Sequence, residues 1–148
     1  MWIRTLTTLE CSKILADNRL GNLACTKDGR PYVVPFSYVY ADNHLHAFSL
    51  PGKKIEWMRY NPQICLLMEE KKHGRAWKSV VVDGRYEEIP ERIGHKQDRE
   101  HAWSLLSKHA NWWEPGSLKP EASPPSEPSP PVFFRVRIEQ LSGREAKE

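Results

Sequence analysis

The chain has 148 residues, a length that suits one domain with its own hydrophobic core. Hydrophobic residues make up 39%, charged residues 28% and aromatic residues 10%, which excludes disordered and membrane-embedded classes. The net charge of +3 favours anionic ligands, but the basic residues do not cluster as in a dedicated nucleic-acid binder.

Localisation signals and cysteine motifs are lacking in the sequence. No apolar run approaches the ~18 residues that span a bilayer, and the first residues lack the apolar stretch of a signal peptide. We therefore expect a cytoplasmic protein with no membrane partner. Cys11, Cys25 and Cys65 lie too far apart for a disulfide framework or a metal motif, so they should be small core residues.

The first predicted element is a helix that follows a capping box. Thr7 and Glu10 have the required spacing, and the helix should continue through about Ala16. A strand at 22–26 and a turn at 27–30 should come next.

A second strand is predicted at 32–40, because the segment is rich in Val, Tyr and Phe. Pro35 cannot donate a hydrogen bond to a strand ladder, so this strand should lie at an edge or be bulged there. The neighbouring backbone groups would then be free to meet a flat polar ligand.

The segment from His44 to Pro62 predicts a phosphate site. After a turn at 41–43, a third strand, 44–49, ends at Ser49, and Gly52, Lys53 and Lys54 then open a short helix that stops at Asn61-Pro62. A helix N-terminus offers unpaired N–H groups and partial positive charge, to which the lysines add full charges. The spacing is not that of a Walker loop, so ATP or GTP is not indicated.

A metal site is the less favoured interpretation of the histidines. His44 and His46 would share one face of a strand, but a closed site needs further ligands at suitable spacing. We expect them to be polar, outward-facing strand residues, and we predict no metal.

The rest of the chain adds strands and one long helix. The continuous apolar run 64–68 predicts a strand buried on both faces, and 77–84 predicts another, which 85–89 extends past a break at Gly84. A helix is expected from Pro90-Glu91 to about His109, and a Pro-rich loop or tether at 119–131. The alternation at 132–138 predicts a final strand that completes the sheet.

Six or more strands joined by hairpins, with two helices inserted, predict a mainly β fold: an antiparallel barrel with peripheral helices, in one domain that spans 1–148. A barrel that binds single-stranded nucleic acid through aromatics and lysines remains open at this point.

Several ordered motifs carry a resemblance to a known family. They are Leu23-Ala24-Cys25-Thr26, the run from Gly29 to Pro35, Gly52-Lys53-Lys54, Asn61-Pro62, the run from Trp77 to Gly84, Trp112-Trp113-Glu114-Pro115 and Ser142-Gly143-Arg144. With these motifs the chain resembles the FMN-binding split-barrel superfamily, the flavoproteins related to pyridoxamine 5′-phosphate oxidase, and most closely its nitroimidazole-resistance-like branch. The resemblance covers about Leu9 to Arg144, with 119–131 as a local insertion, and implies an antiparallel, Greek-key-like split barrel.

The resemblance also implies a homodimer with FMN at the subunit interface. Val34, Pro35, Phe36 and Ser37 would run beside the isoalloxazine ring, partly through backbone atoms. Ser79 would lie near the ring. Four residues match the positions that hold the ribityl phosphate: Phe48, Ser49, Lys53 and Lys54. Three others lie in regions that could reach the flavin of the partner subunit: Trp112, Trp113 and Arg144.

The functional hypothesis that follows is an FMN-dependent oxidoreductase acting on a small molecule, with NAD(P)H as a possible donor and no assigned catalytic side chain. Phe48 replaces the histidine that many nitroimidazole-resistance relatives carry, and the substrate-binding arginine and histidine of the oxidase are not recognisable. Pyridoxamine phosphate is therefore not the expected substrate. A flavin carrier or sensor without turnover, and the nucleic-acid-binding barrel, are the alternatives.

Overall fold

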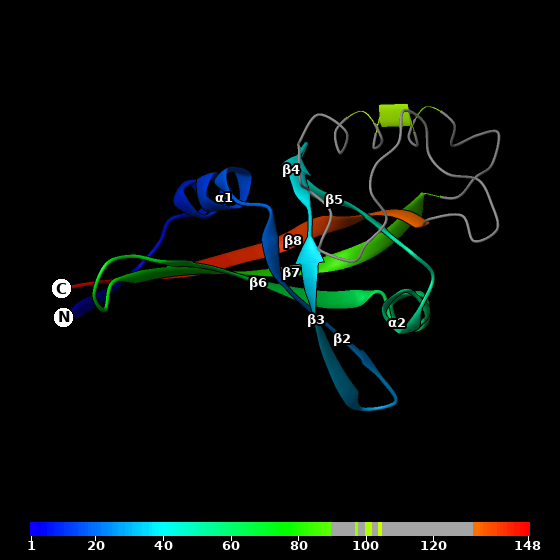
Figure 1. Cartoon of the computed structure of the whole chain (residues 1–148), viewed down its shortest axis with the longest axis horizontal. Coiled ribbons are helices and arrows are strands. Elements are labelled where there is room, and N and C mark those ends of the chain that lie inside the picture. The colour runs from blue at the N-terminus through cyan, green and yellow to red at the C-terminus, as the bar shows by residue number, and fades with distance from the viewer. Residues whose placement is uncertain (90–96, 98–99, 102–103, 105–131) are drawn as a thin grey trace.

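In the computed structural model, an antiparallel sheet of eight strands and two flanking helices make up most of the described chain (Figure 1). The structure describes residues 1–89, 97, 100, 101, 104 and 132–148. Among these residues, no helix is both long and apolar enough to cross a bilayer. The elements in chain order are β1 (Trp2–Thr5), α1 (Thr8–Asp17), β2 (Leu20–Lys27), β3 (Arg30–Ser37), β4 (Val39–Ala41), β5 (His44–Ser49), α2 (Lys53–Tyr60), β6 (Gln63–Lys71), β7 (Trp77–Ile89) and β8 (Val132–Lys147).

The sheet curves back on itself because one residue joins its two outermost strands. Neighbouring strands follow the order β3-β2-β6-β7-β8-β5-β4, and β1 pairs with β8. Tyr38 alone separates the end of β3 from the start of β4. Its N–H donates to the Arg19 carbonyl at 2.8 Å, and its buried hydroxyl donates to the Leu15 carbonyl at 3.0 Å. These bonds hold a corner of the barrel, so the prediction of one continuous strand at 32–40 was wrong.

The longest ladder joins β7 and β8, and a β-bulge interrupts it. The register shifts between Asp83 and Gly84, and Glu139 is left without a partner. This confirms the predicted break at Gly84, while β8 runs to Lys147, far beyond the predicted end at 138. A Cβ atom on Gly84 would lie 2.5 Å from Cγ1 of Val136, so the close approach of β8 requires glycine here.

Aromatic side chains fill the interior of the barrel. The Phe134 ring centroid lies 5.8 Å from that of Phe36 and 5.2 Å from that of Tyr86, which joins β3, β7 and β8 through one cluster. Cys11 and Cys25 are buried, as predicted, whereas Cys65 is half-buried on the opposite face of the sheet.

The middle of β6 alternates between two environments. Ile64, Leu66 and Met68 are buried, while Cys65 and Leu67 are only half-buried. The prediction of a strand buried on both faces was therefore wrong for the described chain. The physical reason is that no described element covers the outer face of the sheet here, although its side chains are apolar.

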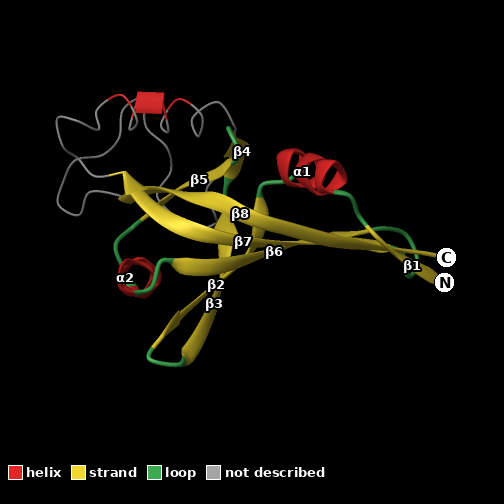
Figure 2. Cartoon of the chain, turned by 180° about the vertical axis from the view of Figure 1, so that it is seen from behind, coloured by secondary structure: helices red, strands yellow, loops and turns green. Residues whose placement is uncertain are grey.

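The predicted capping box begins α1. The Glu10 N–H donates to the Thr7 hydroxyl at 3.2 Å, and the Thr7 N–H donates to the Glu10 carboxylate at 3.1 Å. Arg4 also donates to Glu10, and this hydrogen bond is the main cause that lowers the Glu10 pKa to about 2. Figure 2 shows α1 and α2 on opposite sides of the long β6–β8 ribbon.

Two tight turns explain the hairpins. Asp28 and Gly29 have φ of 52° and 78°, and Asp42 and Asn43 have φ of 54° and 58°. Positive φ at both central residues is the type I′ geometry that matches the twist of paired strands. The predicted turns at 27–30 and 41–43 are confirmed.

Two predictions fall largely outside the described residues. These are the helix from Pro90-Glu91 to about His109, of which only residues 97, 100, 101 and 104 are described, and the Pro-rich segment 119–131. Trp112 and Trp113 also lie outside the described part of the chain.

Candidate functional site

The N-terminus of α2 is open for an anion. Gly52 occupies the N-cap position and supplies no side-chain hydrogen bond to the helix. A Cβ atom built on Gly52 would meet no atom within 4 Å, so the space on that side of the N-cap residue is open. Lys53 and Lys54 are the first two helical residues. The partial positive charge of the helix N-terminus and the side chains of two lysines therefore coincide at this position.

Lys53 rests on two aromatic rings. Its Nζ lies 4.4 Å from the centroid of the Tyr32 ring and 4.7 Å from that of Trp57, and the two rings are 5.5 Å apart. This cation–π contact holds the ammonium beside the end of the barrel instead of leaving it in bulk solvent. Burial raises the pKa of the nearby Cys25 thiol, and the charges of Lys53 and Lys54 act in the opposite direction.

The loop before α2 brings the end of β5 to the same place. Phe48 and Ser49 are half-buried and close β5, and three residues separate Ser49 from Lys53. The Phe48 ring packs on Phe133 of β8 at a centroid distance of 5.3 Å. The Ser49 hydroxyl donates to the Leu50 carbonyl at 3.0 Å, so it can donate to an anion only by giving up this bond. Phe48 and Ser49 thus end the strand that leads into Lys53 and Lys54 of α2, and their common role at a phosphate stays a prediction.

β3 is an edge strand, as Pro35 predicted. It pairs only with β2 among the described strands, so its far side carries unpaired backbone groups. Val34 and Ser37 are half-buried and Pro35 is exposed. The Phe36 side chain is 1% exposed and packs in the core, so Phe36 could contact a ligand only through its backbone.

Ser79 and Arg144 form a second group. They are directly opposite each other in the β7–β8 ladder, on the outer face of the sheet. Phe48 is opposite Phe133 near the start of β8, so about 35 Å of extended strand separates the two groups along β8. One chain therefore does not bring Ser79 and Arg144 together with Lys53 and Lys54.

Sequence reasoning missed Tyr32 and Trp57 as partners of Lys53. The signal for Trp57 is its position four residues after Lys53, one helical turn along α2. The signal for Tyr32 is its position near the start of the strand that contains Pro35. The pairing of a strand residue with a helix residue appears only in the fold.

His46 corrects the expectation that the strand histidines face outward. Its side chain is 3% exposed, near the rings of His44 and His101, whose centroids each lie 6.0 Å away. Burial lowers the His46 pKa to about 4; the Ala41 backbone acts in the opposite direction, and His44, His101 and Arg135 lower it further. Asp42 and Glu87 are the carboxylates next to this cluster, paired with His101 and His44. His46 is therefore neutral at pH 7.

This burial predicts an acid-sensitive stability. The unfolded chain binds a proton at His46 with a pKa near 6.5, and the folded chain only near 4, so the unfolded state takes up more protons between these values. We expect the free energy of unfolding to fall by about 3 kcal/mol as the pH drops through this window. Urea unfolding at pH 7 and pH 4 measures it.

The matched variants for this prediction are His46→Phe and His73→Phe. His73 is exposed, so its replacement should leave the pH dependence unchanged, whereas His46→Phe should flatten it. Equal slopes in the wild type and in His46→Phe would contradict the assignment.

Comparison with known proteins gives the family. The model of the family described as pyridoxamine 5′-phosphate oxidase matches residues 7–145. The chain belongs to this family. An uncharacterized protein of Rhizobium meliloti (strain 1021) is 47% identical over 146 residues, which cover 99% of this chain and 97% of that protein.

Solved structures of the family share the barrel. The crystal structure of an FAD-binding protein from Mesorhizobium loti has 62% sequence identity and a TM-score of 0.81, and the match covers 99% of this chain and 100% of that one. An FAD-binding protein from Mycobacterium smegmatis matches with a TM-score of 0.69 at 18% identity, over 97% of this chain and 100% of that one. A candidate 5-nitroimidazole antibiotic resistance protein from Bacteroides thetaiotaomicron matches with a TM-score of 0.74 at 22% identity, over 98% and 89% of the two chains. The last two likenesses concern the fold alone, which is the split barrel that the sequence predicted.

Proposed function

We propose that this chain is a flavoprotein that binds the flavin mononucleotide unit at the N-terminus of α2 and acts as an oxidoreductase on a small molecule. The observation that carries the proposal is the open N-terminus of α2, with Lys53 and Lys54 as its first two residues. Membership of a family whose Mesorhizobium loti member is an FAD-binding protein supports it.

The residues present fit a flavin phosphate. Helix N–H groups, two ammonium groups and the Ser49 hydroxyl are the donors that a phosphate accepts from. The unpaired edge of β3, which includes Val34, Pro35 and Ser37, offers backbone donors and acceptors to the polar rim of a flavin ring. When bound, a flavin supplies hydride chemistry, and the chain positions the ring and keeps water from it.

The separation of Ser79 and Arg144 from the phosphate site at the N-terminus of α2 supports a homodimer. Ser79 and Arg144 lie on the outer face of the sheet, away from Lys53 in the same chain. That outer face also carries Leu20 and Val33, which are 58% and 61% exposed, and the half-buried Leu67. An exposed apolar sheet face of this kind is suited to a second copy. We propose that the dimer places Ser79 and Arg144 of one chain beside the flavin of the other.

FMN is the proposed cofactor, because the helix N-terminus with Lys53 and Lys54 offers donors to the one phosphate group that FMN carries. FAD contains the same flavin mononucleotide unit, so chromatography of the extracted cofactor identifies which one the protein carries. The proposed electron donor is NAD(P)H, and we place the protein in the cytoplasm.

The visible absorption spectrum of the purified protein tests the proposal. We expect oxidised-flavin bands that bleach on anaerobic addition of NADPH or NADH. Bands that persist with both nucleotides would favour a flavin carrier or sensor. Absence of bands even after addition of FMN and FAD would refute flavin binding, and affinity for single-stranded nucleic acid that falls with salt would then be tested.

A further inference from the structure

Two aromatic side chains from different elements hold the ammonium of Lys53. Its Nζ lies 4.4 Å from the ring centroid of Tyr32 on β3 and 4.7 Å from that of Trp57 on α2. The two rings are inclined to each other by 53°, so the ammonium meets two ring faces from different directions. Both side chains are half-buried and pack against the hydrophobic core. We call this pair of rings the aromatic seat.

The two elements that carry the aromatic seat, α2 and the β2–β3 hairpin, are bonded to each other. The Asn61 amide donates to the Thr26 hydroxyl at 2.9 Å, and the Tyr60 hydroxyl donates to the Asp28 carboxylate at 3.0 Å. These bonds join the end of α2 to the end of β2 and to the turn that follows it. The spacing of the two rings is therefore fixed by the fold and does not depend on a bound ligand.

The aromatic seat holds Lys53 without neutralising it. A ring attracts a cation through its quadrupole and carries no net charge, whereas a carboxylate would cancel the charge of the ammonium. Within the described part of the chain, Lys53 takes part in no ion pair. The charges of Lys53 and Lys54 also both oppose the rise in pKa that burial causes at the Cys25 thiol, so they act at the same end of the barrel.

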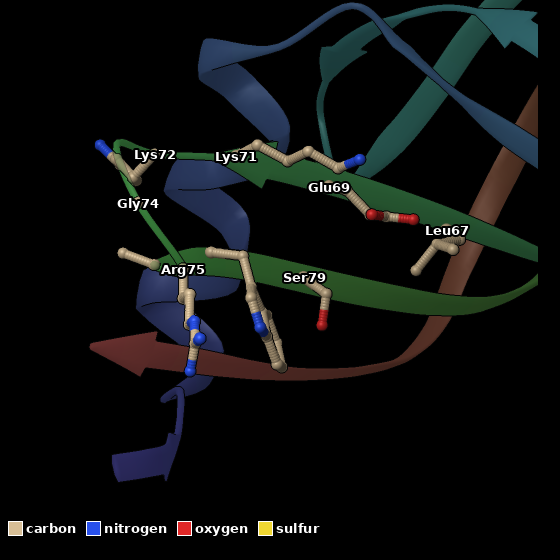
Figure 3. A pocket seen from close by; sticks show the side chains of 9 residues that line it. Leu67, Glu69, Lys71, Lys72, Gly74, Arg75 and Ser79 are labelled. Atoms are coloured by element: carbon tan, nitrogen blue, oxygen red, sulfur yellow. The ribbon is translucent and has the colours of Figure 1, made fainter. Parts of the chain in front are cut away.

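A second group of basic side chains differs from Lys53 in this respect. Lys71, Lys72 and Arg75 line a groove at the β6–β7 hairpin, together with the carboxylate of Glu69 (Figure 3). Figure 3 shows the three basic side chains extending in different directions. None of the cation–π contacts between described residues involves them. A lysine held on two rings is thus a feature of the α2 end of the barrel and not of this groove.

We propose that Tyr32 and Trp57 are positioning residues: they hold Lys53 for a phosphate and so determine a preference for phosphorylated flavins over riboflavin. The inference rests on the proposed function, which places the flavin phosphate at the N-terminus of α2. A lysine side chain loses rotamer freedom when it binds an anion, and this loss weakens binding. The aromatic seat restricts Lys53 before the flavin binds, so its charge-assisted hydrogen bond to the phosphate forms at a smaller entropic cost.

Equilibrium dialysis of the purified protein against a mixture of FMN and riboflavin tests the proposal. Chromatography of the bound flavins gives the ratio of the riboflavin dissociation constant to the FMN dissociation constant. Both ligands contain the same ring and ribityl chain, so damage to the fold or to the ring site changes both constants and leaves their ratio unchanged. A change in the ratio therefore reports on the phosphate alone.

We expect the ratio to fall about threefold in Trp57→Leu and in Tyr32→Leu, because each variant removes one of the two rings. Trp57→Phe and Tyr32→Phe keep a ring and should restore most of the preference. Trp57 packs against the core, so Tyr32→Leu provides the test if Trp57→Leu does not fold. The matched control is Trp2→Leu, since the Lys147 Nζ lies 5.4 Å from the Trp2 ring centroid, on a strand that Figure 2 shows far from α2. Its ratio should match that of the wild type.

A double-mutant cycle separates positioning from direct contact with the flavin. Lys53→Ala alone should lower the ratio about tenfold, and Trp57→Leu added to it should lower the ratio no further. An additional threefold fall in the double variant would overturn the proposal. A wild-type ratio in both Trp57→Leu and Tyr32→Leu, with the effect of Lys53→Ala retained, would also overturn it and leave the phosphate site standing. A ratio near one in the wild type would refute the phosphate site and the role of the aromatic seat with it.

Discussion

The double variant Lys53→Ala/Lys54→Ala should purify without bound flavin. Each ammonium can make a charge-assisted hydrogen bond to a phosphate, and such bonds contribute about 1.5–3 kcal/mol each. Removal of both should therefore raise the dissociation constant of FMN by about a hundredfold or more. The ratio of flavin absorbance to protein absorbance after gel filtration measures the loss, and fluorescence titration with FMN gives the new constant.

The matched control is Lys13→Ala/Lys27→Ala. It makes the same change in net charge, and Lys27 also rests on an aromatic ring, with its Nζ 5.2 Å from the Tyr60 centroid. Because neither lysine lies at the start of α2, this control should keep its flavin. Stoichiometric flavin in Lys53→Ala/Lys54→Ala would refute the phosphate site at α2, and equal loss in both double variants would show a general charge effect.

The variant Leu66→Ala should lose about 2–5 kcal/mol of unfolding free energy. Leu66 is 1% exposed at the centre of β6, where it pairs with Leu23 of β2 and Val82 of β7. Truncation of a buried leucine costs the transfer free energy of its side chain plus a term for the cavity that remains. Urea unfolding monitored by tryptophan fluorescence at pH 7, where His46 is neutral, measures the difference.

Leu9→Ala provides the same substitution without burial. Leu9 is 81% exposed on α1, and alanine is a good helix former, so its unfolding free energy should change by less than about 0.5 kcal/mol. A loss of the same size in both variants would contradict the assignment of β6 to the centre of the core.

Local sequence determined the elements whose signals depend on neighbouring residues. The capping box of Thr7 and Glu10, the turns at Asp28-Gly29 and Asp42-Asn43, and the start of a helix after Gly52 were all confirmed. Each involves residues within four positions of one another, so the chain's own covalent geometry and short-range hydrogen bonds decide it. Pro35 likewise predicted an edge or a bulge, because a missing N–H is accommodated at such positions, and β3 is an edge strand among the described strands.

The tertiary structure decided every feature that depends on distant residues. Tyr38 breaks the predicted strand because its N–H bonds to Arg19, and His46 is buried because other segments pack over its strand. Lys53 meets Tyr32, and Ser79 meets Arg144 on a face remote from Lys53, only once the sheet closes. The types of residues needed for a phosphate site were therefore evident from the sequence, whereas the division of the predicted site residues between two faces came from the fold. The physical reason is that strand pairing and burial join residues far apart in the chain, and no local pattern fixes those pairings.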